Sequence, residues 1–378
     1  MVEWKTIGEI CIPLKKEIIK QSDLKEDGKY PVVNSGVSLY GYYDDYNNEG
    51  NAFTLASRGE YAGFISYLND SFWAGGLCYP YRSKDETQYI TKYIYGYLKR
   101  RERFIMDTLV MRGGIPALNK ADVDKIKIPI PSLEEQTRIV GILDTFTSAI
   151  DNLKEQIAQR RKQYEYYRDQ LYYASKADLL EASRNGKAIV KSLDELGTFT
   201  RGRRFVRTDI VPEGVPCIHY GDMYTYYGVS AEETPTHLTK ELSSKLRFAK
   251  NGDVVIVAAG ENDLDIGVGV AWLGKEPVVV HDACFIYEHK MNSKYLSHFM
   301  RSRNYHQQIR MGVVDGKICS ISAKELGRAL IAVPPLSEQQ RIVSILDTFE
   351  ASVSNLEAQL KQREKQYEYY RNKLLTFE

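Results

Sequence analysis

The chain has 378 residues, which is too long for one ordinary hydrophobic core and fits two domains of roughly 130–150 residues plus connecting elements. An apolar content of 43% and a mean hydropathy of −0.40 are typical of a soluble globular protein, and no run approaches the roughly 20 apolar residues that span a bilayer. A membrane protein is therefore excluded. The net charge of +1 argues against a protein that holds nucleic acid by bulk electrostatics alone.

The N-terminal sequence shows no secretion signal. Residues 1–5 lack a basic stretch followed by an apolar core, so we expect a cytoplasmic protein. The cysteines are odd in number and scattered, with no Cys-x-x-Cys pair, so we predict buried thiols and neither a disulfide framework nor a metal site. They are Cys11, Cys78, Cys217, Cys284 and Cys319.

The first block, residues 1–130, is predicted to be a domain of strands and helices. Residues 51–59 are β-prone and end in a polar turn with glycine, and strand character resumes over residues 63–67. One helix is expected from residue 90 to 111. This order indicates a curved sheet with exposed loops followed by a helix.

The next block, residues 131–175, is predicted to be one long spacer helix. Its start carries a capping box, Ser132-Leu133-Glu134-Glu135, and Pro131 bars extension upstream. Apolar residues recur in alternating steps of four and three, which is a heptad seam for packing on another helix. The first five seam positions are Ile139, Leu143, Phe146, Ile150 and Leu153.

The remaining chain repeats this order. Residues 176–333 carry strand-like runs over 252–260 and 267–272 and one expected helix over 294–310, and residues 334–378 form a second spacer helix. Residues 131–171 and 334–374 are identical at about 25 of 41 positions, at an offset of 203. The second seam begins with Ile342, Leu346, Phe349, Val353 and Leu356.

The second variable block also begins like the first one. Residues 4–10 resemble residues 190–196 at an offset of 186, so the first variable block is shorter than the second. The chain therefore has the order variable, constant, variable, constant.

Two such seams in one chain are expected to pack on each other, because each exposes an apolar stripe. A parallel, in-register pair would set Arg160 against Arg363 within the seam, whereas an antiparallel pair avoids this like-charge contact. The expected fold class is α+β: two domains with curved, mixed β-sheets, joined by two long antiparallel coiled-coil helices in a pseudo-twofold repeat. At 1.5 Å per residue a seam of some 33 residues is a ruler of roughly 50 Å, or about fifteen base pairs.

Candidate nucleic-acid contacts lie in the turns of both variable blocks. Sequence readout needs side chains that present paired donors or acceptors to base edges from loops or helix tips. The 28 tyrosines add groups suited to contact with sugars, phosphates and bases. The candidate DNA-binding residues are Arg58, Arg112, Arg201, Arg203, Arg204, Tyr220 and Lys317.

No catalytic signature is complete. The Gly267-Val268-Gly269 run lacks the Asn-Pro-Pro-aromatic or Asp-Pro-Pro-aromatic partner of a methyltransferase, and residues 269–276 have phosphate-loop spacing but end in Glu276 instead of a hydroxyl residue. Asp282 with Glu288, His289 and Lys290 resembles the acidic-x-Lys cluster of a nuclease. The alternation of Ala283, Phe285 and Tyr287 with the intervening residues instead predicts a strand. We expect no catalytic residues and no cofactor in this chain.

The tract Pro-x-Leu-x-Glu-Gln-x-Arg-Ile-Val stands at residues 131–140 and again at 334–343, and each copy enters a long helix. This tract, with the alternating block order, resembles the specificity subunits of Type I restriction-modification systems across essentially the whole chain. The resemblance implies target-recognition domains at 1–130 and 176–333, each reading one half of a split, asymmetric DNA target. It implies no base-contact residues, because these vary with the target.

The resemblance also implies partners. Two adenine methyltransferase (modification) subunits would dock on the helices and carry S-adenosylmethionine, and they would recruit nuclease-translocase (restriction) subunits. Double-stranded DNA would be the ligand. Because the modification subunits also embrace the DNA, a near-neutral specificity subunit is compatible with this role.

Two other functions remain open on sequence alone. A coiled-coil scaffold that displays two β domains to protein partners, as a homodimer, would show no sequence-selective, salt-dependent DNA binding. A single-chain DNA methyltransferase is opposed by the missing donor and catalytic loops, and it would bind the methyl donor by itself.

Overall fold

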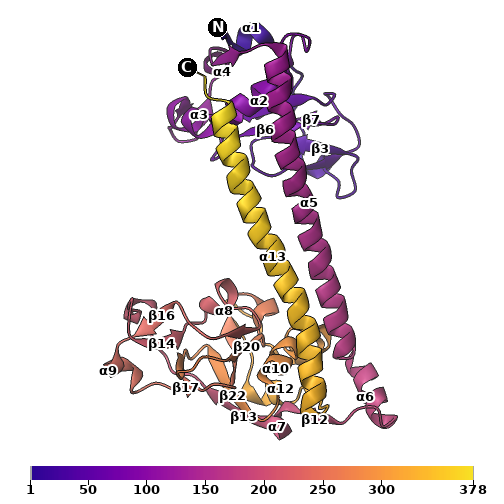
Figure 1. Cartoon of the computed structure of the whole chain (residues 1–378), viewed down its shortest axis with the longest axis vertical. Helices are drawn as coiled ribbons and strands as arrows, with labels where there is room; N and C mark the ends of the chain where they lie inside the picture. Colours follow the sequence, from indigo (N-terminus) through magenta and orange to yellow (C-terminus); the bar gives the residue numbers. More distant parts are fainter. Residues whose placement is uncertain (1, 378) are drawn as a thin grey trace. The chain divides into compact units, whose positions relative to one another are not determined.

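The computed structural model describes residues 2–377, which divide into two compact units (Figure 1). Unit 1 comprises Met1–Lys154 and Ala358–Glu378, and unit 2 comprises Glu155–Glu357. Each unit therefore combines one variable block with stretches of both spacer helices. Among the described residues, no helix has the length and apolar character needed to cross a membrane.

The two spacer helices are α5 (Leu133–Leu171) and α13 (Leu336–Leu374), each of 39 residues. Both are unbroken, which confirms the long helices predicted from the two heptad seams. At 1.5 Å per residue each is about 58 Å long. A short helix, α6 (Lys176–Arg184), follows α5.

The variable part of unit 1 contains a four-stranded sheet of order β2-β8-β5-β6 and a three-stranded sheet of order β4-β3-β7. Two further antiparallel pairs, β1–β11 and β9–β10, complete it. The elements are β1 (Glu3–Thr6), α1 (Ile7–Ile10), β2 (Cys11–Pro13), η1 (Gln21–Asp23), β3 (Tyr30–Val33), β4 (Gly41–Tyr43), β5 (Ala52–Ala56), β6 (Ile65–Leu68), β7 (Trp73–Ala74), β8 (Cys78–Ser83), α2 (Thr91–Arg100), α3 (Glu102–Thr108), β9 (Val110–Met111), β10 (Ala117–Leu118), α4 (Lys120–Asp124) and β11 (Lys127–Ile130).

The variable part of unit 2 repeats this layout with one added strand at an edge of each main sheet, in the orders β13-β22-β18-β20-β15 and β16-β14-β21-β17. The pair β12–β24 corresponds to β1–β11, the pair β19–β23 corresponds to the isolated Arg58–Ala117 bridge of unit 1, and the Val314–Ser320 bridge corresponds to β9–β10. The elements are β12 (Val190–Ser192), α7 (Leu193–Leu196), β13 (Gly197–Arg201), η2 (Arg207–Asp209), β14 (Val215–Ile218), α8 (Asp222–Thr225), β15 (Ser230–Ala231), β16 (Thr236–Leu238), α9 (Lys240–Ser243), β17 (Phe248–Ala249), β18 (Val254–Val257), β19 (Ala259–Gly260), η3 (Asp263–Asp265), β20 (Gly269–Trp272), β21 (Val278–Val280), β22 (Cys284–His289), α10 (Ser293–Phe299), α11 (Arg303–Ile309), η4 (Arg310–Gly312), β23 (Cys319–Ser320), α12 (Ala323–Gly327) and β24 (Leu330–Ala332).

The predicted strands are present, but the predicted single helices are wrong. The run 51–59 contains β5, and the runs 252–260 and 267–272 contain β18 and β20. The helix expected over residues 90–111 is two helices, α2 and α3, and the helix expected over 294–310 is α10 and α11. In unit 2 the break has a clear cause, because the Ser302 side chain accepts a hydrogen bond from the Tyr305 N–H and so caps a new helix.

The start of each variable part is fixed by the same local device. Thr6 pairs with Glu9 at the start of α1, and Ser192 pairs with Glu195 at the start of α7, as capping boxes. These pairs are related by the offset of 186, so the faint resemblance of the two block starts has a structural basis.

A buried glutamine anchors each spacer helix to the recognition part of its unit. In unit 1 the Ile90 N–H donates to the Gln136 Oε1 at 2.9 Å, and the Gln136 Nε2 donates to the Pro131 carbonyl at 3.0 Å. In unit 2 the Asn292 N–H donates to the Gln339 Oε1 at 2.8 Å, and the Gln339 Nε2 donates to the Pro334 carbonyl at 2.8 Å. The glutamine of the repeated tract is therefore a fixed joint between the spacer helix and the helix that follows the sheet.

Each unit closes its core with the start of one spacer helix and the end of the other. In unit 1 the buried Ile139 and Leu143 of α5 and the buried Leu375 after α13 lie in one apolar cluster with the sheet and α2. In unit 2 the buried Ile342 and Leu346 of α13 and the buried Tyr172 after α5 do the same. Five of the predicted seam positions thus contribute to packing inside the units: Ile139, Leu143, Ile150, Ile342 and Leu346 are buried.

Within each unit the two helices run antiparallel, as predicted. In unit 1 the rings of Phe146 and Tyr370 stack at 5.2 Å, with the Arg363 guanidinium over Phe146 at 5.9 Å. In unit 2 the same contacts recur between Phe349 and Tyr167 at 5.3 Å, with Arg160 over Phe349 at 5.9 Å.

The two seam arginines therefore each face a phenylalanine. Attraction of a guanidinium to an aromatic face replaces the like-charge contact that a parallel pair would impose. The remaining seam positions Leu153, Val353 and Leu356 are partly buried.

The glutamine joint can be tested by substitution. We expect Gln339→Leu to lower the free energy of unfolding by about 1–3 kcal/mol, because it leaves the partly buried Asn292 N–H without its acceptor. Chemical denaturation measures this change. Ser344→Ala is the control on the same helix, since the exposed Ser344 hydroxyl only donates to the Gln340 carbonyl. An equal, small effect of both substitutions would show that Gln339 is not an anchor.

Candidate nucleic-acid interface

In unit 1, two of the predicted contact residues lie on neighbouring turns. Arg58 follows β5 and forms an isolated bridge with Ala117, and the Gly59 N–H donates to the Pro116 carbonyl at 3.0 Å. Arg112 begins the loop that joins β9 to β10, and it lies 3.5 Å from Asp107. Both arginines are exposed, so the turn after β5 and the β9–β10 loop form one edge with two exposed cations, of which Arg112 pairs with Asp107.

Unit 2 builds the same edge from different side chains. Ala259 of β19 pairs with Ser320 of β23, and Val314 bridges Ser320 across the loop. Lys317 lies at the exposed tip of this loop. The two loops read Arg-Gly-Gly-Ile-Pro at residues 112–116 and Asp-Gly-Lys-Ile-Cys at residues 315–319.

One apolar feature of the loops is shared. Ile115 and Ile318 are related by the offset of 203, and they are 69% and 62% exposed. Each loop therefore presents an isoleucine beside a single cation, which is placed differently in the two loops. An exposed apolar group next to a cation is suited to a groove, where it can contact a thymine methyl group.

A second group of predicted residues lies around His281 in unit 2, whose ring packs against that of His219. Gly202 follows β13 and lies close to the backbone of residues 280–281. A Cβ at Gly202 would lie 2.2 Å from the His281 carbonyl oxygen. This close approach requires glycine and sets Arg201, Arg203 and Arg204 around His281. The Arg201 Nε donates to the Asp282 carbonyl at 2.8 Å, and Arg203 donates to the Lys245 carbonyl at 2.7 Å.

His281 holds this loop as a neutral ring. Burial lowers the pKa of His281, while the nearby Asp282 carboxylate partly opposes the shift. The Ala283 N–H donates to Nδ1 at 3.1 Å, so Nε2 carries the proton and donates to the Phe205 carbonyl at 3.0 Å. Tyr220 packs nearby, with its ring 5.6 Å from that of His281.

The structure thus collects the predicted residues into three groups. Arg58 and Arg112 share one edge of unit 1, Lys317 occupies the corresponding loop of unit 2, and the remaining four surround His281. The members of that last group are Arg201, Arg203, Arg204 and Tyr220.

Sequence reasoning missed several cations beside these groups. The Arg247 Nη1 donates to the Arg201 carbonyl at 2.5 Å. Burial lowers the pKa of His219, and the charge of the nearby Arg207 adds to this shift. Only the tertiary structure brings Arg247 to this loop. In unit 1 the exposed Lys15 and Lys16 follow β2, and the offset of 186, which relates Lys15 to Arg201, could have revealed Lys15.

Several basic residues of the segments after the sheets are structural. The Lys99 Nζ donates to the Ile65 carbonyl and pairs with Glu102, and Arg100 donates to the Leu375 carbonyl at 2.9 Å. Arg301 donates to the carbonyl groups of Gly269 and Gly228. These cations are engaged inside their units and present few free donors to a ligand.

All five cysteines are buried, which confirms the predicted burial of the thiols. His298, Asp347 and Glu350 lie close enough together to hold a metal ion. Lys294 already pairs with Asp347, and the Tyr164 hydroxyl is 3.0 Å from the His298 Nδ1, so the donor atoms are engaged in a hydrogen-bonded network.

Comparison with known proteins decides the family. The family model described as Type I restriction modification DNA specificity domain matches residues 1–160 and 185–365. The chain belongs to this family. Its two matched ranges place one specificity domain in each half of the chain.

Full-length relatives agree with this assignment. The chain is similar to a putative type I restriction enzyme specificity subunit of Haemophilus influenzae, with 27% identity over 100% of this chain and 96% of that protein. It is also similar to the EcoR124I/EcoR124II specificity subunit of Escherichia coli, with 28% identity over 100% of this chain and 94% of that protein.

Solved structures share the fold. The S subunit of a type I restriction-modification system from M. genitalium matches with a TM-score of 0.63 at 18% identity, over 100% of this chain and 97% of that one. A chain from a structural study of type I system assembly matches with a TM-score of 0.58 at 16% identity, over 99% and 97%. The α+β fold with two repeats predicted from the sequence is therefore confirmed.

The histidines predict different responses of the two units to acid. All six histidines lie in residues 155–357, and burial lowers the pKa of His289 to about 4. In the unfolded chain His289 takes a proton below about pH 6.5, whereas in the folded unit it stays neutral down to about pH 4. The unfolded state therefore binds more protons in this window, and the stability of unit 2 decreases as the pH falls through it.

Hydrogen exchange between pH 6.5 and 5 measures this effect. We expect peptides of unit 2 to lose protection, relative to the intrinsic exchange rate, while peptides of unit 1, which has no histidine, keep theirs. His289→Gln should reduce the pH dependence in unit 2. Equal loss of protection in both units would contradict the assignment.

Proposed function

We propose that this chain is the DNA sequence-specificity subunit of a Type I restriction-modification complex, in which each recognition domain reads one half of an asymmetric bipartite target. The observation that carries this proposal is that the two units share one fold but present different exposed side chains from corresponding loops. Residues 112–116 and 315–319 occupy corresponding positions and share an isoleucine, but they differ in the place of their cation. Two different half-sites follow from this difference.

The spacer helices would fix the separation of the half-sites and dock two methyltransferase subunits. Support comes from the 39-residue length of each helix and from the glutamine joints, which hold each recognition part rigidly on its helix. A recognition domain on a rigid joint can read a half-site at a defined distance, whereas a flexible linker would permit many spacings.

The chemistry would lie on the partners. We infer that this chain carries no catalytic residues and no cofactor, and that S-adenosylmethionine belongs to the methyltransferase subunits, with restriction subunits as further partners. The relatives are named as specificity subunits, which supports a non-catalytic role. The alternative of a protein-binding scaffold lacks a comparable observation.

The main test is methylome sequencing of cells that express the chain with its cognate methyltransferase subunit. We expect adenine methylation at one bipartite motif. Exchange of residues 1–125 for the same region of another specificity subunit should change only one half of the motif. A contiguous motif, no motif, or measurable binding of the methyl donor by the chain alone would contradict the proposal.

Substitution of a single exposed arginine tests whether it contacts DNA. Arg204 is exposed near His281, and we expect Arg204→Ala in the chain–methyltransferase complex to weaken target binding by about 1–3 kcal/mol if it reads a base. If it contacts a phosphate, binding to all sequences weakens and the salt slope falls by about one. Arg328→Ala is the charge-matched control, because Arg328 lies at the C-terminal cap of α12 and pairs with Glu325 at 2.6 Å. Equal binding by both variants in a salt titration would remove Arg204 from the interface.

A further inference from the structure

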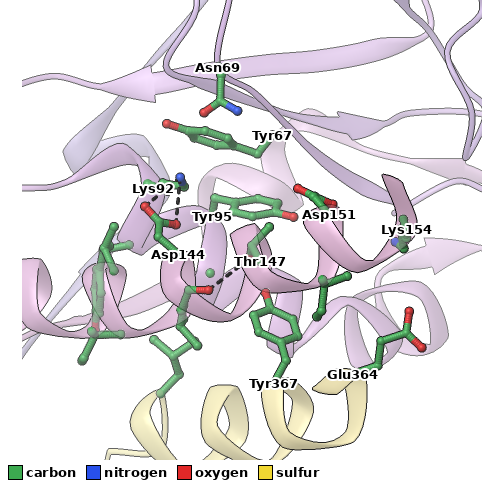
Figure 2. A pocket seen from close by; sticks show the side chains of 17 residues that line it. Tyr67, Asn69, Lys92, Tyr95, Asp144, Thr147, Asp151, Lys154, Glu364 and Tyr367 are labelled. Carbon is green, nitrogen blue, oxygen red and sulfur yellow. Dashed lines mark hydrogen bonds and ion pairs between the residues drawn. The ribbon is translucent and has the colours of Figure 1, made fainter. Parts of the chain in front are cut away.

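Unit 1 contains a cavity of about 390 Å³ between α2, the end of β6 and the facing stretches of α5 and α13 (Figure 2). Its size falls within the roughly 300–1,000 Å³ range of small-molecule sites. The wall combines aromatic rings, apolar side chains of the helix seam and a charged rim. Its polar and aromatic residues are Tyr67, Asn69, Lys92, Tyr93, Tyr95, Asp144, Thr147, Asp151, Lys154, Glu364 and Tyr367.

The internal repeat gives this cavity a counterpart in unit 2. Lys92 pairs with Asp144 in unit 1, and Lys294 pairs with Asp347 in unit 2. One residue further along, the Tyr93 hydroxyl donates to the Pro129 carbonyl, and the Tyr295 hydroxyl donates to the Ala332 carbonyl. These matched contacts fix the register of α2 against α10.

In that register Gly96 of unit 1 corresponds to His298 of unit 2. His298 is fully buried and fills its site. Its Nε2 lies 3.4 Å from Asp347 and its Nδ1 lies 3.0 Å from the Tyr164 hydroxyl. Because burial lowers the pKa of His298, the ring is neutral, and it donates from Nε2 and accepts at Nδ1.

Unit 1 keeps both partners of that imidazole but lacks the imidazole itself. Asp144 corresponds to Asp347 and Tyr367 to Tyr164 at the offset of 203, whereas Thr147 stands in place of Glu350. Among the described residues, the structure records no hydrogen bond of the Tyr367 hydroxyl (Figure 2). The Asp144 carboxylate contacts only Lys92 among the residues drawn there.

The glycine at position 96 is not required by the backbone. It lies within α2, and a Cβ there would lie 3.6 Å from the Leu375 Cδ1 and 3.8 Å from the Leu143 Cδ1, which is ordinary contact. Glycine inside a helix costs about 1 kcal/mol relative to alanine. Its effect here is to leave open the space that an imidazole fills in unit 2.

We propose that this cavity binds a planar nitrogen heterocycle of the imidazole type, which donates a ring N–H to Asp144 and accepts a hydrogen bond from the Tyr367 hydroxyl. The Tyr67 and Tyr95 rings, 5.2 Å apart, form an aromatic wall for its face. The volume also admits a fused ring such as a purine. The natural source is either a free heterocycle or a histidine side chain of a bound partner, and both present the same chemistry to the site.

The test uses the full chain and imidazole at pH 8.5, where imidazole is mostly neutral. We expect a saturable rise of the melting temperature of a few degrees, with one bound equivalent. Gly96→His should abolish this response and should raise the melting temperature without ligand, because its own ring fills the cavity. The absence of a saturable response in the parent chain would overturn the proposal.

Further variants distinguish loss of the binding site from misfolding of the chain. Gly96→Ala adds only a Cβ and should keep binding, whereas Tyr367→Phe removes the hydroxyl and should weaken binding about tenfold. His298→Gly should create a second site in unit 2 that imidazole fills. Imidazole binding by Gly96→His that equals binding by the parent chain would also overturn the proposal.

Two further arms identify the source. Adenine replaces imidazole in the same titration, and its tighter binding would point to a free purine. If a partner histidine is the occupant, Gly96→His should weaken assembly with the methyltransferase subunit at least tenfold, and imidazole should compete with assembly. The assembly arm rests on the proposed function, whereas the imidazole and adenine titrations need neither DNA nor a partner subunit. A failure of the heterocycle proposal in these titrations is therefore distinguishable from a failure of the proposed function.

Discussion

Closure of each hydrophobic core by two helix ends is the constraint on which the rest of the structure depends. The core of unit 1 needs Ile139 and Leu143 from α5 and Leu375 from the segment after α13. The core of unit 2 needs Ile342 and Leu346 from α13 and Tyr172 from the segment after α5. Neither recognition part has a complete core of its own, because side chains from both helix ends belong to that core. Burial of apolar surface is the main favourable contribution to folding. Each recognition part therefore forms together with both helices.

This constraint explains where the two repeats are alike and where they differ. The repeated tract supplies the buried glutamine, the core isoleucine and an exposed ion pair, such as Glu135 with Arg138 at 2.7 Å. The added strands β15 and β17 of unit 2 lie at sheet edges, and the differing loops at 112–116 and 315–319 are exposed. Edges and loops can change without loss of core packing. In such a fold the exposed recognition loops can change while the packing of each recognition part on the spacer helices stays the same.

The polar sites under the helices show divergence of another kind. In unit 2 a buried imidazole completes a network with a carboxylate and a tyrosine hydroxyl, and in unit 1 the same two partners border open space. In unit 1 the half-buried Asp144 carboxylate is paired with Lys92, whereas no hydrogen bond of the half-buried Tyr367 hydroxyl is recorded among the described residues. A hydroxyl without a partner is costly in proportion to its burial, so this site favours an occupant or water. The comparison of one repeat with the other makes the difference visible without any second protein.

The duplication, the two long helices, their antiparallel sense and the short strands around residues 51–59 and 252–260 could be predicted from the sequence. These features depend on periodicity and local signals, such as the heptad seam and the prolines that precede each helix. The tertiary structure alone decided that the segments after the sheets break into two helices and that Arg301 is a structural residue.

Only the tertiary structure, too, brought Arg247 and His281 together around Arg201 and opened a cavity at Gly96. Each of these features depends on which residues distant in sequence fill the space beside a given side chain. Local patterns of hydrophobicity and turn residues carry no information about that space.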